Sequence, residues 1–327
     1  MKYQFCTLFD KNYIYKGVTL YNSLLKHCPD FTLWILCMDD VTLKTLTKMG
    51  LEKASLIDIS DFEDEELRRI KPSRTVAEYC WTCTPSLPLY VLKKEPSLDA
   101  ITYLDADLFF YSDPSAIYEE LGRSSIMIIE HRFPDHLKHY EVNGIYNVQM
   151  LVFRNDESGR ECLEWWREKC NEWCFYRLED GKMGDQKYLD DWPTRFQGVH
   201  VLQYEGAGVA LWNVMKYKIW KQSDRIFVND VPLVFYHFHQ FTLLKEGSYD
   251  FGNRGIYNLT PENIALIYHP YVLEIERSIA RVREVDRQFN YGFSPTEKDS
   301  VFDRLSHMYQ DARCEISSLY RTVLKRC

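Results

Sequence analysis

The sequence has no run of 18 or more apolar residues, although 46% of its 327 residues are hydrophobic. Because a membrane-spanning helix needs about 20 predominantly apolar residues, no transmembrane segment is expected. The first ten residues combine a short apolar run with a polar turn, which predicts a strand instead of a signal peptide. These absences predict a cytoplasmic protein, either free or held at the inner face of the membrane.

Positive charge is also in deficit, because 40 lysine and arginine residues face 48 aspartate and glutamate residues, a formal net charge of −8. This balance argues against nonspecific nucleic-acid binding, so no nucleic-acid partner is expected. Low-complexity segments are absent, and aromatic residues make up 15% of the chain, so we expect it to be folded throughout. The pattern predicts a main domain over residues 1–258 and a helical, highly charged C-terminal region over residues 259–327.

The ten cysteines include two pairs whose spacing matters. Cys80 and Cys83 have the spacing of half a zinc site or of a redox pair, and Cys170 and Cys174 could form the other half of the zinc site. Both pairs lie in segments rich in aromatic and aliphatic residues, where cysteine behaves as a small hydrophobic residue. We therefore expect reduced, packed thiols, with structural zinc as the alternative.

Strand and helix patterns alternate along the first half of the chain. Residues 3–9, 31–38 and 56–59 are apolar runs typical of strands, and the segments between them have helical periodicity. This order predicts an α/β fold with a mainly parallel sheet flanked by helices. In such sheets ligands bind at the carboxyl ends of the strands, where Asp10 and Asp39 lie.

The most informative segment is residues 103–110, Tyr-Leu-Asp-Ala-Asp-Leu-Phe-Phe. Here an apolar strand ends in Asp105 and Asp107, and a second apolar run follows. A buried carboxylate is costly unless it is paired or bound to a metal, so two of them beside one strand indicate a cation site. Oxygen ligands suit Mn²⁺ or Mg²⁺, and a site with few protein ligands leaves positions for substrate phosphates. The segment therefore predicts a nucleoside-diphosphate site.

This segment, followed by Asp113-Pro114, resembles the Asp-x-Asp region of GT-A glycosyltransferases. It is most similar to glycosyltransferase family eight, the group of glycogenin and lipopolysaccharide galactosyltransferase, or to related bacterial nucleotide-diphospho-sugar transferases. The resemblance implies a GT-A (Rossmann-like) mixed sheet and an Mn²⁺ or Mg²⁺ cofactor. It also implies transfer of a sugar from a nucleotide-sugar donor, a UDP-sugar, to a hydroxyl on a glycan, lipid-linked or protein acceptor. Bacterial surface polysaccharide or glycoconjugate synthesis is the setting that it suggests.

The resemblance further implies a third metal ligand, His237, because residues 234–238 are similar to the family's His-Phe element. After that element the family usually has a glycine and then a lysine that grips the diphosphate. This chain instead has His239, Gln240, Phe241 and Thr242. His239, Lys245 and Arg254 are therefore the candidate substitutes for that lysine.

Other site residues are also implied by the resemblance. Asp185 and Gln186 are similar to a pair near the anomeric carbon and are the catalytic candidates, with capping of a helix as the alternative role for Asp185. Trp212 and Asn213 are candidates for the acceptor side. The predicted donor-binding residues are Thr7, Leu8, Phe9, Asp10, Tyr13, Asp39, Arg74, Thr82, Asp105, Ala106, Asp107, Asn147 and Gln149. Tyr79 and Ser86 are candidates together with Arg74 and Thr82, and capping or packing of their helix is the alternative role for these four.

Asn147 and Gln149 alternate along one apolar strand, so they should share a face. Sugar hydroxyls would satisfy these amides; bonds to neighbouring backbone are the alternative. Retention of anomeric configuration rests on the resemblance alone, and Asp185 or Glu130 would be the first general-base candidate for an inverting reaction.

Two other functions compete with sugar transfer. A sugar-phosphate nucleotidylyltransferase would also place aspartates on a metal, but it normally opens with a glycine-rich phosphate loop, and residues 5–17 contain only Gly17. A noncatalytic carbohydrate-binding protein is compatible with the many aromatic residues. Mn²⁺-dependent hydrolysis of a nucleotide sugar separates this last alternative from the enzyme.

Overall fold

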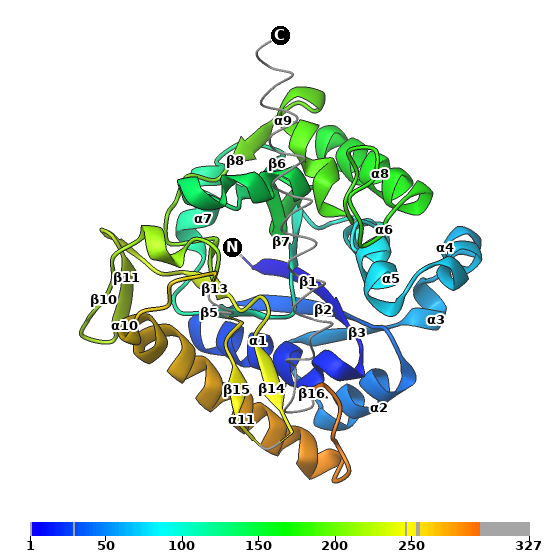
Figure 1. Cartoon of the computed structure of the whole chain (residues 1–327). Helices are drawn as coiled ribbons and strands as arrows, with labels where there is room; N and C mark the ends of the chain where they lie inside the picture. The colour runs from blue at the N-terminus through cyan, green and yellow to red at the C-terminus, as the bar shows by residue number, and fades with distance from the viewer. Residues whose placement is uncertain (1, 29, 246, 253–255, 295–327) are drawn as a thin grey trace.

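The structure is a computed structural model that describes residues 2–28, 30–245, 247–252 and 256–294. Within these residues a seven-stranded central sheet has the order β3-β2-β1-β4-β7-β6-β8 (Figure 1). Strand β7 is antiparallel to its neighbours β4 and β6, and the other pairs are parallel. This confirms the predicted mixed, mainly parallel α/β architecture. The strands are β1 (Tyr3–Phe9), β2 (Phe31–Cys37), β3 (Ala54–Asp58), β4 (Ala100–Leu104), β6 (Ile126–Glu130), β7 (Tyr146–Arg154) and β8 (Val199–Val201).

Helices cover both faces of this sheet (Figure 1). The longer ones are α1 (Ile14–His27), α2 (Asp40–Met49), α5 (Val76–Cys83), α6 (Ser86–Lys94), α7 (Ser115–Leu121), α8 (Glu157–Glu172) and α11 (His269–Val285). The shorter helical elements are η1 (Lys11–Tyr13), α3 (Ile59–Phe62), α4 (Glu65–Ile70), η2 (Lys71–Ser73), η3 (Asp135–Asn143), η4 (Gln186–Asp191), α9 (Trp192–Arg195), η5 (Val214–Lys216), α10 (Pro261–Asn263) and the π-helical η6 (Ile264–Tyr268).

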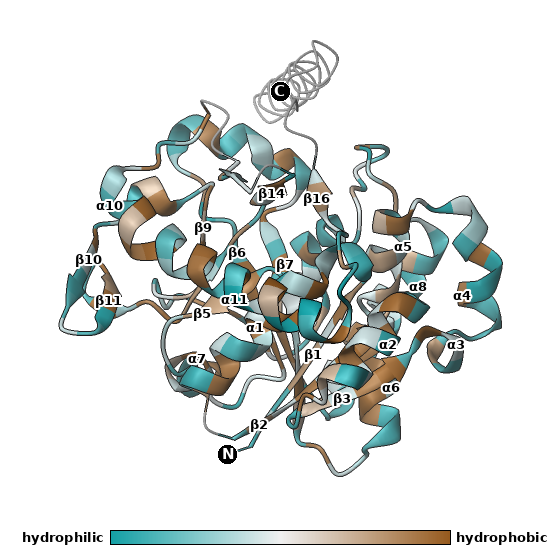
Figure 2. Ribbon diagram, turned by 90° about the horizontal axis from the view of Figure 1, so that it is seen from below, coloured by the Kyte–Doolittle hydropathy of each residue, from teal (hydrophilic) through white to brown (hydrophobic). Residues whose placement is uncertain are grey.

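The core is divided between the two faces of the sheet. Successive residues of a strand point to opposite faces, and accordingly Phe5 joins the hydrophobic cluster on the α1 and α11 side, whereas Cys6 joins the cluster on the α6 and α8 side. Figure 2 shows hydrophobic residues along the central strands and in α6, and a mixture of hydrophobic and hydrophilic residues on α1 and α11. The amphipathic helices therefore bury one side each against the sheet.

A small second sheet positions the candidate site. It has the order β5-β13-β9, formed by β5 (Leu108–Phe110), β13 (Phe235–His237) and β9 (Val209–Ala210). Strands β5 and β13 are antiparallel, with His237 opposite Leu108, and Phe238 N donates to Asp107 O at 3.0 Å. The sequence motif after β4 is thus bonded directly to Phe238, which lies 131 positions after Asp107. The remaining strands are β10 (Ile219–Gln222), β11 (Arg225–Val228), β12 (Val231–Pro232), β14 (Thr242–Leu244), β15 (Tyr249–Asp250) and β16 (Phe293–Ser294).

Some elements are short or divided. Residues 231–237 form two strands, β12 and β13, and α8 ends at Glu172, because Trp173 is extended. Residues 76–94 form two helices, α5 and α6, which meet at Thr84 and Pro85.

The C-terminal region is helical over residues 261–285, as predicted. Its helix α11 packs against α1, where Thr19 Oγ1 donates to Ser278 Oγ at 2.8 Å and Asn22 Nδ2 donates to Glu274 Oε1 at 2.7 Å. Residues 295–327 of this region lie outside the described residues. No helix among the described residues is both long and apolar enough to cross a membrane.

Candidate functional site

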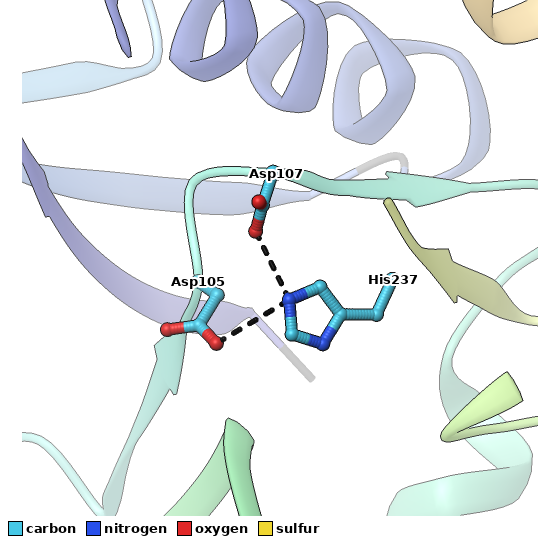
Figure 3. A group of neighbouring side chains, drawn as sticks. All are labelled: Asp105, Asp107 and His237. Atoms are coloured by element: carbon cyan, nitrogen blue, oxygen red, sulfur yellow. Dashed lines mark ion pairs between the residues drawn. The ribbon is translucent and has the colours of Figure 1, made fainter. Parts of the chain in front are cut away.

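Three side chains that could ligate a metal meet where β4, β5 and β13 come together. Asp105 follows β4, Asp107 precedes β5 and His237 ends β13. His237 Nε2 lies 3.1 Å from Asp107 Oδ1 and 3.7 Å from Asp105 Oδ2 (Figure 3). One potential ligand atom from each of the three residues lies within 4.8 Å of the other two, so a single dication could contact all three side chains.

Local hydrogen bonds hold the two carboxylates in place. Asp105 N donates to Gln149 O at 2.9 Å, which ties the end of β4 to β7, and Tyr103 Oη donates to Asp105 Oδ1 at 3.1 Å. Phe110 N donates to Ser23 Oγ at 3.1 Å, which anchors β5 to α1. The carboxylates therefore lie on a turn that is bonded at both ends.

Burial and mutual charge perturb the cluster. Burial raises the pKa of Asp105 to about 6, against the opposing effect of His237. Burial would also raise the pKa of Asp107, but the imidazole of His237 and the ammonium of Lys16 outweigh it and hold that pKa below its usual value. Asp107 in turn raises the pKa of His237, although burial alone would lower it. Strongly perturbed groups that converge in a cleft are typical of functional sites.

The cluster lies in the wall of a cavity of about 810 Å³. This cavity opens at the carboxyl ends of β1 and β4, where ligands bind in α/β sheets. The predicted site residues that line it are Leu8, Phe9, Asp10, Tyr13, Asp105, Ala106, Asp107, Asn147, Asp185, Gln186, Trp212, His237 and His239.

Several predicted donor-binding residues lie outside the lining. Asp39 caps α2 by accepting from Thr42 N at 2.8 Å, and it also accepts from Lys11 N at 2.9 Å. The Arg74 guanidinium stacks 3.9 Å from the ring centre of Phe175. The other candidate site residues of every predicted role that lie outside the lining are Thr7, Thr82, Gln149, Tyr79, Ser86, Asn213, Glu130 and Lys245. Arg254 lies outside the described residues.

Gln186 is held by a network of amides in the cavity wall. Asn147 Nδ2 donates to Gln186 Oε1 at 2.9 Å, and Gln186 Nε2 donates to Asn143 O at 3.2 Å. Gly144 leaves room for this side chain, because a Cβ at Gly144 would lie 2.9 Å from Gln186 Cγ. The orientation of Gln186 is thus fixed by the protein itself.

His131 continues the network. Its Nδ1 lies 3.1 Å from Ile145 O and its Nε2 lies 3.1 Å from Asn147 Nδ2. These contacts require a neutral ring with the proton on Nδ1, and burial lowers the pKa of His131 to about 3. Trp212 Nε1 donates to His131 O at 2.9 Å, which places the indole in the cavity wall.

Asp185 is the most perturbed carboxyl that faces the cavity. Burial, and secondarily the charge of Asp105, raises its pKa to about 8. The peptide oxygen of Asp185 accepts from Trp166 Nε1 at 2.9 Å, so the start of η4 is anchored to α8. At neutral pH this carboxyl holds a proton and can donate a hydrogen bond.

Sequence reasoning missed part of the cavity wall. His131 and the aromatic residues Trp81, Phe133, Tyr140 and Tyr176 line the cavity, and buried Lys16 pairs with Asp107. His131 follows β6 directly, so its place after a strand was the available signal. The aromatic residues come from α5, from η3 and from loops, where no strand end indicates them.

The cysteine pairs do not form a second metal centre among the described residues. Cys83, Cys170 and Cys174 are buried, and Cys80 lines the cavity. Within the described ranges, the group of potential ligands found is Asp105, Asp107 and His237. The packing interpretation therefore accounts for these thiols.

Fold and site together define an α/β protein with a candidate dication centre at the carboxyl edge of its sheet. The chain belongs to the same family as two proteins of Bacillus subtilis strain 168. It is 34% identical to the uncharacterized protein YfnD over 297 residues, which is 90% of this chain and 95% of YfnD. It is 33% identical to the uncharacterized protein YfnF over 300 residues, 89% of this chain and 97% of YfnF.

No family model matches the sequence. Among solved structures the chain is similar to the galactosyltransferase LgtC, whose crystal structure contains donor and acceptor sugar analogues. That likeness covers 80% of this chain and 99% of LgtC, with 14% identity and a TM-score of 0.49.

Proposed function

We propose that this protein is a metal-dependent glycosyltransferase that moves a sugar from a nucleotide sugar, a UDP-sugar, to a hydroxyl acceptor. The observation that carries the proposal is the convergence of Asp105, Asp107 and His237 in the wall of the 810 Å³ cavity. The resemblance of residues 103–110 to the Asp-x-Asp region of glycosyltransferases supports the same function.

The ligand atoms of Asp105, Asp107 and His237 fit a divalent cation. Two carboxylates suit hard ions such as Mg²⁺ and Mn²⁺, whereas an imidazole nitrogen favours a transition metal, so the combination favours Mn²⁺. Asp105, Asp107 and His237 would hold it with one ligand atom each, which would leave about half of an octahedral shell for water and substrate oxygens. When bound, such a cation neutralises negative charge that develops on a departing diphosphate.

The chain's own residues would orient the sugar. Asp185, whose pKa burial raises to about 8, lies in the cavity wall and can form a hydrogen bond with a sugar hydroxyl. Gln186, held by Asn147 and Asn143, presents a fixed amide to the same cavity. A preorganised group of this kind costs little reorganisation when substrate binds.

Thermal denaturation with UDP and a panel of UDP-sugars, with and without MnCl₂, tests the proposal. A donor at about 100 times its dissociation constant should add about 2.7 kcal/mol to the free energy of unfolding, and only with Mn²⁺ present. The protein should then release UDP from that sugar nucleotide in an Mn²⁺-dependent reaction.

The variant Asp107→Asn should lose both the shift and the UDP release. Asp40→Asn is the matched control, because the Asp40 side chain is 79% exposed and pairs only at the surface with Lys44. Absence of any Mn²⁺-dependent nucleotide effect in the wild-type protein would overturn the proposed function. Stabilisation by UDP-sugars without UDP release would instead favour a carbohydrate-binding protein.

A further inference from the structure

Lys16 occupies a position that a lysine rarely takes. It lies in the first turn of α1, and its side chain is 5% exposed. The helix dipole disfavours a cation there, and burial of an ammonium is costly unless it is paired. Such a conflict between a residue and its local setting is expected mainly at functional sites.

The compensating charge belongs to the candidate metal site. Lys16 Nζ lies 3.7 Å from Asp107 Oδ2, while the other oxygen, Asp107 Oδ1, lies 3.1 Å from His237 Nε2. One carboxylate therefore joins the lysine to the ligand cluster. Lys16 Nζ also lies 4.3 Å from the ring centre of Tyr13, which lines the cavity.

The packing of α1 fixes this arrangement. Gly17 has no side chain, and a Cβ there would lie 2.3 Å from the Phe9 ring, so the helix approaches β1 closely. Ser23 anchors the same helix to β5, the strand that begins directly after Asp107. Lys16 is thus held by a rigid element and not by a mobile loop.

We propose that Lys16 is a positioning residue whose fixed charge adapts the metal centre to an anionic ligand. The two carboxylates and Lys16 have a formal sum of −1, which becomes +1 when a dication is added. Without Lys16 the sum with a dication would be zero. This inference rests on the proposed function, because it identifies the anionic ligand as a nucleoside diphosphate.

The positive charge of Lys16 has opposite effects on the affinities for the dication and for the diphosphate. Lys16 repels a dication that binds alone, but it attracts a diphosphate that binds after the dication. Removal of the charge should therefore strengthen Mn²⁺ binding and weaken UDP binding. A residue that only supports the fold would not separate these two affinities.

Isothermal titration calorimetry tests this with MnCl₂ alone and then with UDP at saturating MnCl₂. Lys16→Gln keeps a hydrogen-bond donor and removes the charge, and Lys16→Arg keeps the charge. For Lys16→Gln we expect tighter Mn²⁺ binding and roughly tenfold weaker UDP binding, a factor equivalent to about 1.4 kcal/mol. Lys16→Arg should keep both affinities near the wild-type values. Lys44→Gln is the control, because the Lys44 side chain is 71% exposed and is not part of the cavity lining.

Equal shifts of both affinities in Lys16→Gln, or no shift, would overturn the inference. If Lys16→Gln does not fold, Lys16→Arg decides by itself, because a folded arginine variant that loses UDP affinity contradicts a role of the charge. A wild-type protein that binds Mn²⁺ but not UDP would overturn the proposed function and this inference with it. Binding of both ligands by the wild type, with no opposed effect in the variant, would overturn the inference alone.

Discussion

Gly144 offers the sharpest test of how the candidate catalytic residue Gln186 is positioned. Its backbone has φ 146° and ψ 134°, a region that glycine adopts readily and other residues avoid. A Cβ at this position would lie 2.9 Å from Gln186 Cγ and 3.1 Å from Gln186 Nε2. Gly144→Ala should therefore strain the backbone and displace the Gln186 side chain together.

The free-energy cost of the backbone strain can be separated from the cost of the clash with Gln186. The backbone strain should amount to about 1–3 kcal/mol. If the Gln186 side chain stays in place, overpacking adds about 1–3 kcal/mol to the destabilisation. If it moves, Gln186 loses its hydrogen bonds to Asn147 and Asn143, and each of these bonds is worth about 0.5–1.5 kcal/mol. In a Gln186→Ala background the side-chain cost vanishes and the strain remains.

Urea denaturation of the wild type, both single variants and the double variant measures this difference. Gly144→Ala should destabilise the wild type by at least about 1 kcal/mol more than it destabilises Gln186→Ala, a coupling well above the 0.3–0.5 kcal/mol expected of independent sites. If the two effects add within that margin, Gly144 and Gln186 do not contact each other and the network is wrong.

Three further predictions concern the cavity wall. Asp105→Asn replaces a carboxylate ligand with a neutral amide, so the Mn²⁺-induced rise in Tm should vanish while the protein stays folded; an unchanged Mn²⁺ response would remove Asp105 from the site. His131 is held neutral because burial lowers its pKa from 6.5 to about 3, so its contribution to stability is complete above pH 6.5 and is lost as the pH falls towards 3. At 1.36 kcal/mol per pKa unit this loss approaches about 5 kcal/mol, and a His131→Gln variant with the same acid sensitivity in urea denaturation would contradict it. Gln149 is fully buried with no bonding partner for either amide atom among the described residues, so Gln149→Met should raise the free energy of unfolding by about 1–3 kcal/mol. A lower urea midpoint for that variant would show that the amide is bonded.

The sequence predicted the central sheet well because its strands follow simple patterns. β1, β2 and β4 are apolar runs that alternate with helical segments, and they pair in parallel as such an order requires. Asp105 and Asp107 could be placed for the same reason, since they interrupt such a run. The placement of His237 beside these aspartates could be expected only from the family resemblance, because three-residue strands such as β5 and β13 have no periodicity that would indicate their pairing.

Gln149 shows that a shared strand face does not by itself give a shared role. Its place two residues after Asn147 predicted a common role at the sugar, yet Asn147 lines the cavity and Gln149 does not. The alternation holds at this point, because Tyr146 and Val148 both belong to the core cluster on the α6 and α8 side, and the register shift opposite Met127 and Ile129 takes effect only beyond Val148. Gln149 differs from Asn147 in depth, because its side chain is completely buried.

Lys16 presents the opposite case, in which the signal was present and easily misjudged. A lysine in a helix is normally read as part of the solvated face, and only its neighbours Ile14, Tyr15 and Val18, all buried, suggest otherwise. Its partner Asp107 lies 91 positions later, and the contact depends on how α1 packs on β5. Charge compensation across that distance follows from tertiary packing, so the sequence could indicate an unusual lysine but not the carboxylate that it faces. A buried lysine in the first turn of an apolar helix is nevertheless a pattern that can be sought, and here it leads to the same centre as the aspartate motif.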